Sequence, residues 1–362
     1  MTRSASPGQR LWQRAQTEGN PVRDPGRATF VWRAAGARGV PQVIGDFMHW
    51  GREGQTPLTL ERAGPGLWAG ALDLPDDAYL EYAWISRGRR VPDPLNPRTS
   101  PNGMGELNHY FYMPAGAPTP LAQPPRGGLR GALTREVLPA GRLLWHGRRI
   151  VHFYQPPTPD PCPLLVVLDG REYRRQAHLP VLVDNLIAQR RIRPLALALV
   201  ENAGPAARML EYACSETTLA FLLYALLPLA QARLNLIDPA AQPGAHGVLG
   251  ASLGGLMALY AGLRAPQVFG HVLSQAGAFV VEGHPFVVWD LIRYEPRLPI
   301  RLWLDVGRFD WLLDVNRQLY ALAAEKTLAA HFQEFNAGHN FPAWRDDLPR
   351  GLERMFPPAT GG

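Results

Sequence analysis

The chain has 362 residues, 46% of them hydrophobic and 19% charged, with a formal net charge of +6 at pH 7. This balance excludes an intrinsically disordered protein, and the length suits two domains that each bury a core. The first ten residues are polar and no run of 18 apolar residues occurs. We therefore expect a cytoplasmic protein with neither a secretory signal nor membrane insertion. Cys162 and Cys214 are expected to be free thiols.

The basic residues are almost all arginine, since Lys326 is the only lysine among 37 of them. They are scattered, with short clusters at 148–149, 174–175 and 190–193, and no basic stripe alternates with aromatic residues. We therefore expect no nucleic acid partner. The excess of arginine fits either a coding bias over the whole chain or an anionic substrate. No metal or phosphate-loop motif occurs, and we expect no cofactor.

The N-terminal third contains short strand patterns. Residues 1–26 are expected to be a loosely ordered segment, or to pack as a short helix over residues 8–15. Residues 27–114 hold aromatic-rich apolar runs bounded by Gly, Pro and Asp, which predicts an all-β sandwich. Strands are expected at residues 29–33, 42–46, 67–73 and 79–85. Residues 115–131 contain four prolines and four glycines, which predicts a linker.

Residues 132–362 alternate strand and helix patterns. This order predicts an α/β domain with a mostly parallel sheet and helices on both faces. Strands are expected at residues 150–154, 164–168, 195–200, a run ending at 249, 300–306 and 330–335. Helices are expected at residues 177–188, 217–232, 256–264 and 313–328.

The sequence GASLGG at residues 250–255 places Ser252 between an apolar strand pattern and a helix pattern. A strand, a sharp turn of small residues and a helix make up the nucleophile elbow of α/β-hydrolases. Glycines allow the strained turn that exposes the serine oxygen, and the helix N-terminus points amides toward a developing oxyanion. The simpler alternative is a glycine-rich turn without a catalytic role.

Two later residues complete the chain order nucleophile, acid, histidine. Asp310 follows the strand pattern at 300–306, and His339 lies in a loop after the next strand pattern. Open α/β sheets place their chemistry at such strand ends. Asp305 is expected to be structural because it lies within the strand, and Asp314 is the alternative acid. In this interpretation Ser252 attacks an acyl carbon and His339 transfers the proton.

The oxyanion hole is expected to use two backbone amides. The amide of Leu253, directly after the nucleophile, is one candidate. The second should lie in the loop after an earlier strand, where either Gly170 or Arg171 follows the strand pattern at 164–168.

The ordered motifs resemble those of the enterochelin esterases, in the esterase D-like branch of the α/β-hydrolases. The resemblance covers nearly the whole chain. In the N-terminal part it rests on residues 30–32 (FVW), 45–50 (GDFMHW), 56–58 (TPL) and 93–97 (DPLNP). In the C-terminal part it rests on residues 168–170 (LDG), 208–211 (RMLE), 226–228 (LLP), 250–255 (GASLGG), 273–275 (LSQ), 307–310 (GRFD), 316–317 (NR) and 338–345 (GHNFPAWR).

This resemblance implies an early-set, immunoglobulin-like domain followed by a hydrolase domain that cleaves the trilactone backbone of a ferric catecholate siderophore. Iron would arrive bound to the substrate. The implied nucleophile and base are Ser252 and His339, whereas the acid position varies within the family. Arginine side chains suit a large aromatic anion through charge and stacking, so Arg171 and Arg345 are candidate substrate contacts.

Trp50 and Trp344 are candidate aromatic walls for such a substrate, although packing within its domain is the favoured alternative for Trp50. Three other functions remain open. A carbohydrate or general carboxylic-ester hydrolase, such as a feruloyl or acetyl esterase, would use the same triad. A binding protein without catalysis would have no need of all three residues. Acyl transfer would replace water with an alcohol at the acyl-enzyme.

Overall fold

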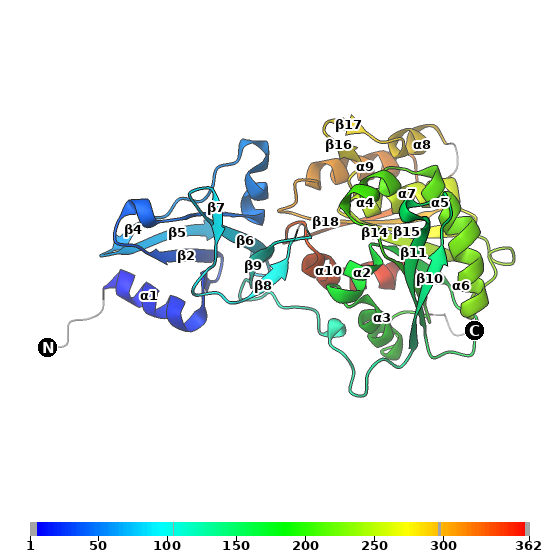
Figure 1. Cartoon of the computed structure of the whole chain (residues 1–362), viewed down its shortest axis with the longest axis horizontal. Coiled ribbons are helices and arrows are strands. Elements are labelled where there is room, and N and C mark those ends of the chain that lie inside the picture. The colour runs from blue at the N-terminus through cyan, green and yellow to red at the C-terminus, as the bar shows by residue number, and fades with distance from the viewer. Residues whose placement is uncertain (1–5, 104, 296–297, 359–362) are drawn as a thin grey trace. The chain divides into compact units, whose positions relative to one another are not determined.

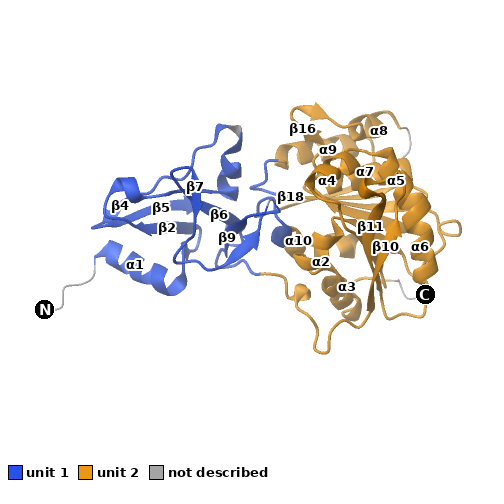
Figure 2. Ribbon diagram, viewed as in Figure 1, with its two compact units in different colours: residues 1–117, 307–311, 335–343 blue, residues 118–306, 312–334, 344–362 orange. Residues whose placement is uncertain are grey.

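The computed structural model describes residues 6–103, 105–295 and 298–358 (Figure 1). The chain forms two compact units, shown in different colours in Figure 2. Unit 1 comprises Met1–Ala117, Gly307–Trp311 and Phe335–Ala343. Unit 2 comprises Pro118–Val306, Leu312–Glu334 and Trp344–Gly362.

Unit 1 contains two antiparallel sheets. The first has the order β1 (Val22–Asp24), β2 (Arg27–Arg33), β5 (Leu67–Asp73) and β4 (Glu61–Gly64). The second has the order β3 (Gln42–Gly45), β6 (Tyr79–Ser86), β9 (Leu107–Tyr112) and β8 (Thr99–Pro101), and β7 (Arg89–Val91) also pairs with β6. The early-set class of this part stays a prediction.

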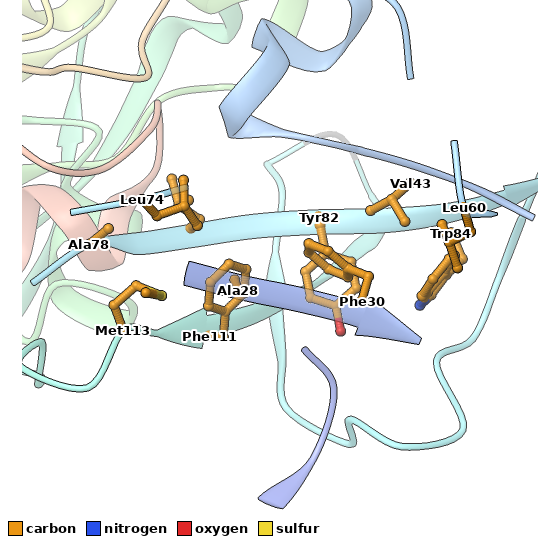
Figure 3. Packing of buried hydrophobic residues seen from close by; sticks show 11 residues of the cluster. Ala28, Phe30, Val43, Leu60, Leu74, Ala78, Tyr82, Trp84, Phe111 and Met113 are labelled. Carbon is orange, nitrogen blue, oxygen red and sulfur yellow. The ribbon is translucent and has the colours of Figure 1, made fainter. Parts of the chain in front are cut away.

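Aromatic side chains from both sheets make the core of unit 1 (Figure 3). Phe30 on β2 packs against Tyr82 and Trp84 on β6 and Phe111 on β9, and all four are fully buried. The ring centres of Phe30 and Tyr82 are 5.0 Å apart in an edge-to-face arrangement. Large rings let two short sheets bury enough apolar surface for a stable core.

The N-terminal segment differs from the loosely ordered expectation for 1–26. Residues Pro7–Glu18 form helix α1, which corresponds to the alternative of a short helix over 8–15. The Ser6 side chain and Gln9 form a capping box at its start, which satisfies amide groups that the helix leaves unpaired. Ala15 is buried against Val22, Val31 and Leu67. Residues 1–5 lie outside the described residues.

Unit 2 is an α/β fold of the hydrolase type around an eight-stranded mixed sheet. The sheet has the order β10 (Ala132–Pro139), β11 (Arg148–Gln155), β13 (Ala196–Val200), β12 (Leu164–Leu168), β14 (His246–Ala251), β15 (Phe269–Gln275), β18 (Arg301–Gly307) and β19 (Ala329–Phe335). Strand β11 is antiparallel to both of its neighbours, β10 and β13, whereas the neighbouring strands from β13 to β18 are parallel to one another.

The predicted strands of this sheet correspond to observed ones, but β10 and β15 were not expected. Strand β10 is mostly exposed, and β15 carries His and Gln within its buried run, so neither has a simple apolar pattern. A two-stranded ribbon, β16 (Val280–Val281) with β17 (His284–Pro285), follows the sheet strand β15.

The helices around the sheet include four that the periodicity did not predict, namely α2, α4, α8 and α10. The predicted helix over 217–232 is observed as α5 and α6, joined by one π-helical stretch at Leu222–Leu226. The helices are α2 (Gly170–Arg175), α3 (Leu179–Ala188), α4 (Pro205–Tyr212), α5 (Glu216–Phe221), α6 (Leu227–Arg233), α7 (Leu253–Arg264), α8 (Val288–Tyr294), α9 (Leu313–Glu325) and α10 (Phe341–Met355).

The segment predicted as a linker, 115–131, is largely attached to α3. The Asn185 side chain donates hydrogen bonds to the carbonyls of Leu121 and Gln123, each at 2.9 Å. The buried Asp184 carboxylate accepts from the backbone amides of Arg130 and Gly131. Because these bonds fix its backbone, this stretch belongs to unit 2 from Pro118 onward.

The predicted continuous domain over 132–362 also differs from the observed units, because two of its loops belong to unit 1. Phe309 packs against the aromatic core of unit 1, and the Tyr79 amide donates to the Asn336 carbonyl at 3.0 Å. Both loops directly follow sheet strands, β18 and β19.

Among the described residues, no single helix is long and apolar enough to cross a bilayer, and only the bent pair Pro205–Tyr212 and Glu216–Arg233, meeting at 89°, has the length and composition to do so. The cytoplasmic location stays a prediction.

Candidate active site

Ser252 occupies the turn between β14 and α7 with φ 58° and ψ −123°, a conformation that a non-glycine residue rarely adopts. The Ser252 amide donates to the Gln275 carbonyl at 2.9 Å, and its carbonyl accepts from the Ala278 amide at 3.0 Å. A Cβ on Gly250 would overlap the backbone of Gly254, so only glycine allows this close approach. The local geometry is that of a nucleophile elbow.

The three candidate oxyanion donors all lie in the first turn of a helix. Leu253 is the first residue of α7, and Gly170 and Arg171 are the first two residues of α2. Amides in a first helical turn have no acceptor within the helix and can bind an anion. The choice between Gly170 and Arg171 stays open, and the oxyanion role of all three residues stays a prediction.

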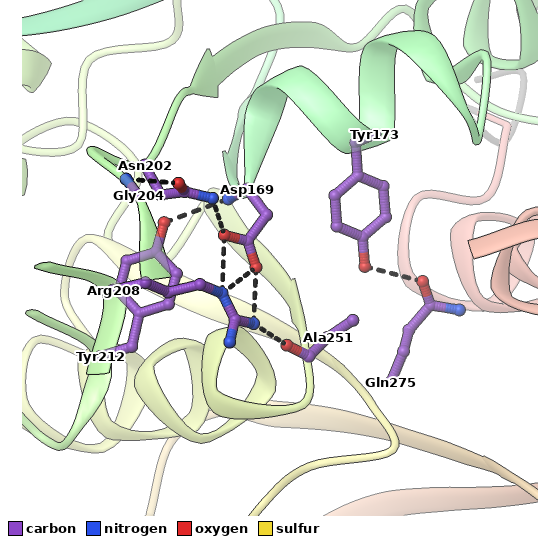
Figure 4. A network of polar contacts seen from close by, with 8 residues as sticks. All are labelled: Asp169, Tyr173, Asn202, Gly204, Arg208, Tyr212, Ala251 and Gln275. Atoms are coloured by element: carbon purple, nitrogen blue, oxygen red, sulfur yellow. Dashed lines mark hydrogen bonds and ion pairs between the residues drawn. The ribbon is translucent and has the colours of Figure 1, made fainter. Parts of the chain in front are cut away.

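A polar network joins these two helix starts (Figure 4). Asp169, at the residue before α2, accepts hydrogen bonds from Arg208 Nη2 at 2.7 Å and from Asn202 Nδ2 at 2.8 Å. Arg208 also donates from Nη2 to the carbonyl of Ala251, directly before Ser252, at 3.1 Å. The guanidinium group thus connects the loop after β12 with the elbow, which gives the 168–170 and 208–211 motifs a structural role.

Asp310 and His339 form a hydrogen-bonded pair within unit 1. Asp310 Oδ2 lies 2.7 Å from His339 Nδ1, Asp310 is fully buried, and the histidine side chain is 13% exposed. The contact with Asp310 involves Nδ1 and not Nε2, and it fixes the orientation of the imidazole ring. The acid–histidine pair of a hydrolase would have this geometry, and the catalytic role of the two residues stays a prediction.

The two other acids near this position have different surroundings. The side chain of Asp314 is 84% exposed and pairs with Arg317 at 3.4 Å. Asp305 is buried and its Oδ2 accepts from Trp303 Nε1 at 2.8 Å. Burial raises the pKa of Asp305 well above its ordinary value, and Asp347 adds to the shift. Among the three acids, the structure therefore places only Asp310 beside His339.

The side chains predicted to contact substrate differ in their solvent exposure and in their hydrogen-bond partners. Trp344 is only 3% exposed, so its proposed role as an aromatic wall is corrected, because a buried ring offers no face to a large ligand. Arg345 forms a two-pronged pair with Asp346 at 2.8 and 3.0 Å. Trp50 donates from Nε1 to Asp46 within unit 1 at 2.8 Å. Arg171 is half-exposed and pairs with Glu201 at 2.8 Å.

A cavity of about 550 Å³ within unit 2 brings together arginines that are distant in the sequence. Arg149 is neutralised by the buried Glu211, and Arg171 by Glu201. Among the described residues, Arg135 and Arg148 have no carboxylate partner. The lining residues are Arg135, Val137, His146, Arg148, Arg149, Ile150, Arg171, Glu201, Asn202, Ala203 and Gly204.

The sequence signal for this cavity was weak. The cluster at 148–149 was visible, but Arg135 comes from the neighbouring strand and Arg171 from α2, so only the tertiary fold joins them. Over the described part of the chain, no group of three or more His, Cys, Asp or Glu side chains could hold a metal ion.

Comparisons with known proteins show similarity to esterases. A family model described as "Putative esterase" matches residues 145–355. An iron(III) enterobactin esterase from Escherichia coli O6:H1 is 28% identical over 293 residues, covering 78% of this chain and 72% of that protein.

Two solved structures share the fold. A ferric enterobactin esterase from Salmonella typhimurium aligns with a TM-score of 0.77 and 23% identity, over 91% of this chain and 93% of that one. A ferulic acid esterase aligns with a TM-score of 0.54 and 16% identity, over 63% of this chain and 98% of that one.

Proposed function

This chain belongs to that esterase family and is a carboxylic-ester hydrolase, and from this premise we propose that it hydrolyses the ester bonds of a catecholate siderophore such as ferric enterochelin. The resemblance to enterochelin esterases, based on ordered motifs, is confirmed by the enterobactin esterase relatives. The observation that carries the proposed chemistry is the elbow conformation of Ser252 together with the Asp310–His339 hydrogen bond.

In the proposed mechanism, Ser252 Oγ attacks the carbonyl carbon of the ester while His339 Nε2 accepts its proton. Asp310 holds Nδ1–H and stabilises the imidazolium that forms. Amides of Leu253 and of Gly170 or Arg171 stabilise the tetrahedral oxyanion. His339 then returns the proton to the leaving alcohol. In the second half of the reaction His339 takes a proton from water, which attacks the acyl carbon, and then returns that proton to Ser252 Oγ as the acid product leaves.

Two observations support an anionic aromatic substrate. The relatives named above are esterases of iron(III) enterobactin, which suggests the same class of ester for this chain. The arginine-lined cavity offers guanidinium groups on Arg135 and Arg148 beside the apolar side chains of Val137 and Ile150. Planar guanidinium groups bind oxygen anions and stack on aromatic rings.

The second candidate function is a feruloyl-type esterase, favoured by the structural match to a ferulic acid esterase. That match spans 63% of this chain, whereas the enterobactin esterase match spans 91%. The sequence relatives, which are esterases of iron(III) enterobactin, favour the siderophore ester. Hydrolysis of ferric enterobactin compared with a feruloyl ester, each at equal enzyme concentration, tests the choice.

We expect the double substitution Arg135→Gln with Arg148→Gln to raise KM for an anionic catechol ester and leave kcat nearly unchanged. Each exposed charge contact contributes about 1 kcal/mol or less, so the rise should be roughly five- to tenfold. Hydrolysis of an uncharged aryl acetate should stay the same. The matched control is Arg190→Gln, an exposed arginine of unit 2 that does not line the cavity.

If the double variant keeps the wild-type KM for the catechol ester, the cavity does not bind the substrate anion. The triad proposal would stand in that case, because it rests on other residues.

A further inference from the structure

The loops that carry Asp310 and His339 belong to unit 1, together with the two antiparallel sheets. The loop after β18 is anchored by Phe309, whose side chain packs on the aromatic core around Phe30 and Tyr82. The Phe309 amide donates to the Ala337 carbonyl at 3.1 Å, which ties this loop to the histidine loop. The acid and the base are therefore held in one packed substructure.

The histidine loop extends the second sheet of unit 1. The backbone of Ala337 forms a parallel bridge with Tyr79 at the start of β6. The Tyr79 amide donates to the Asn336 carbonyl at 3.0 Å, and Asn336 Nδ2 donates to Asp77 Oδ1 at 2.6 Å. These bonds fix the residues just before His339 in the same way that a strand fixes its neighbour.

A single buried carboxylate contacts this loop on either side of His339. Asp46 Oδ2 accepts from the Glu81 amide at 2.8 Å and from Asn340 Nδ2 at 3.3 Å, while Oδ1 accepts from Trp50 Nε1 at 2.8 Å. A Cβ on Gly338 would overlap the Asp46 carboxyl group. Residues 338 and 340 thus both pack on Asp46, and His339 lies between them.

The electrostatics agree with this proximity. Burial raises the pKa of Asp46 to about 7, while the Glu81 amide and the Trp50 indole oppose the shift. Asp310 raises the pKa of Asp46 further and His339 lowers it, as a nearby negative and positive charge would. Burial, with a contribution from Asp46, raises the pKa of Glu81 to about 8.

An aromatic contact restrains the imidazole from the other loop. The rings of Trp311 and His339 have centres 4.4 Å apart with their planes tilted by 36°, and the Arg52 guanidinium lies 4.4 Å from the centre of the Trp311 ring. Arg52 follows Asp46 in the same short helical segment, Asp46–Gly54. This one segment of the N-terminal part thus contributes to both loops.

We infer that Asp46 is a positioning residue for His339, so that the N-terminal β-rich part holds the acid–base pair of the reaction. The inference rests on the proposed role of His339 as the base. It gives the 45–50 (GDFMHW) motif a function in catalysis that is independent of substrate recognition.

The test compares Asp46→Ala and Asp46→Asn with wild type, using a small uncharged aryl ester. We expect Asp46→Ala to lower kcat about 10- to 100-fold with KM changed less than about threefold, because a misplacement of about 1 Å can cost two orders of magnitude. Asp46→Asn keeps one oxygen acceptor and should recover part of kcat. Gly338→Ala, which pushes the loop away from the same carboxylate, should resemble Asp46→Ala.

The matched control is Asp93→Ala, because Asp93 is another buried aspartate of unit 1. Its carboxylate accepts from Asn20, Tyr82, Trp84 and the Leu95 amide, and within the described residues it makes no hydrogen bond to the two loops. Asp93→Ala should lower Tm by a similar amount while kcat stays within about threefold of wild type. Equal kcat losses in the Asp46 and Asp93 variants at equal Tm loss would overturn the inference.

Two further outcomes separate the inference from the function on which it rests. Wild-type kcat in Asp46→Asn and Gly338→Ala, with His339→Ala inactive, would overturn the inference alone. Full activity in His339→Ala would overturn the proposed function first. If Asp46→Ala does not fold, Asp46→Asn and Gly338→Ala provide the same comparison.

Discussion

Ser252→Ala is expected to abolish ester hydrolysis, with kcat lower by a factor on the order of 10⁶. The loss should be this large because the acyl-enzyme cannot form without Oγ, and the dyad and oxyanion donors alone give only a small residual rate. The measurement is the rate of aryl ester cleavage at saturating substrate, with the protein's Tm recorded in parallel.

The control for this substitution is Ser274→Ala. Ser274 is a fully buried serine on β15, so its hydroxyl tests the general effect of removing a serine from unit 2. We expect its kcat to stay near wild type. Activity of Ser252→Ala within a few-fold of wild type would contradict a serine nucleophile at the elbow.

Asp310→Asn is the second substitution with a large expected effect, a kcat lower by about 10⁴. An asparagine keeps the shape but stabilises the wrong tautomer of His339, because its amide group can donate where the carboxylate accepts. The fully buried position of Asp310 and its 2.7 Å bond to Nδ1 make water a poor substitute. The measurement is kcat with a small aryl ester.

Asp314→Asn is the matched control for that experiment. Its side chain is 84% exposed and its ion pair with Arg317 lies at the surface, so the kcat of this variant should stay within about twofold of wild type. A larger loss in Asp314→Asn than in Asp310→Asn would reassign the acid of the triad.

Local sequence patterns predicted much of the hydrolase fold. The runs at 164–168 and 300–306 are apolar because parallel strands are buried on both faces. The glycines around Ser252 indicate a sharp turn. The chain order of Ser252, Asp310 and His339, each just after a strand pattern, indicates which loops could carry a nucleophile, an acid and a histidine. Each of these signals is contained within a few residues.

What the sequence could not predict depends on contacts between distant segments. Phe309 looked like an ordinary loop residue, but its ring packs on the core of unit 1. Asp46 stands more than 290 residues before Asn340, to which it is hydrogen-bonded. No periodicity relates such pairs, so the division into units and the support of the histidine loop were visible only in the structure.

The predicted substrate contacts also depend on tertiary contacts that the sequence does not show. Arg345 is predicted to contact substrate because it lies close to His339 in the sequence, but its guanidinium group is paired with Asp346, and the predicted aromatic wall Trp344 is buried. The cavity instead gathers Arg135, Arg148 and Arg171 from separate elements. Which of these arginines contacts the substrate stays a prediction.

The most direct test of the siderophore esterase proposal is hydrolysis of ferric enterobactin, followed by liquid chromatography of the dihydroxybenzoyl-serine products. Wild type and Ser252→Ala should be assayed in parallel, with a simple aryl ester as the second substrate. We expect rapid cleavage of the trilactone by wild type and none by the variant. Cleavage of the aryl ester alone, with the trilactone intact, would contradict the proposed substrate.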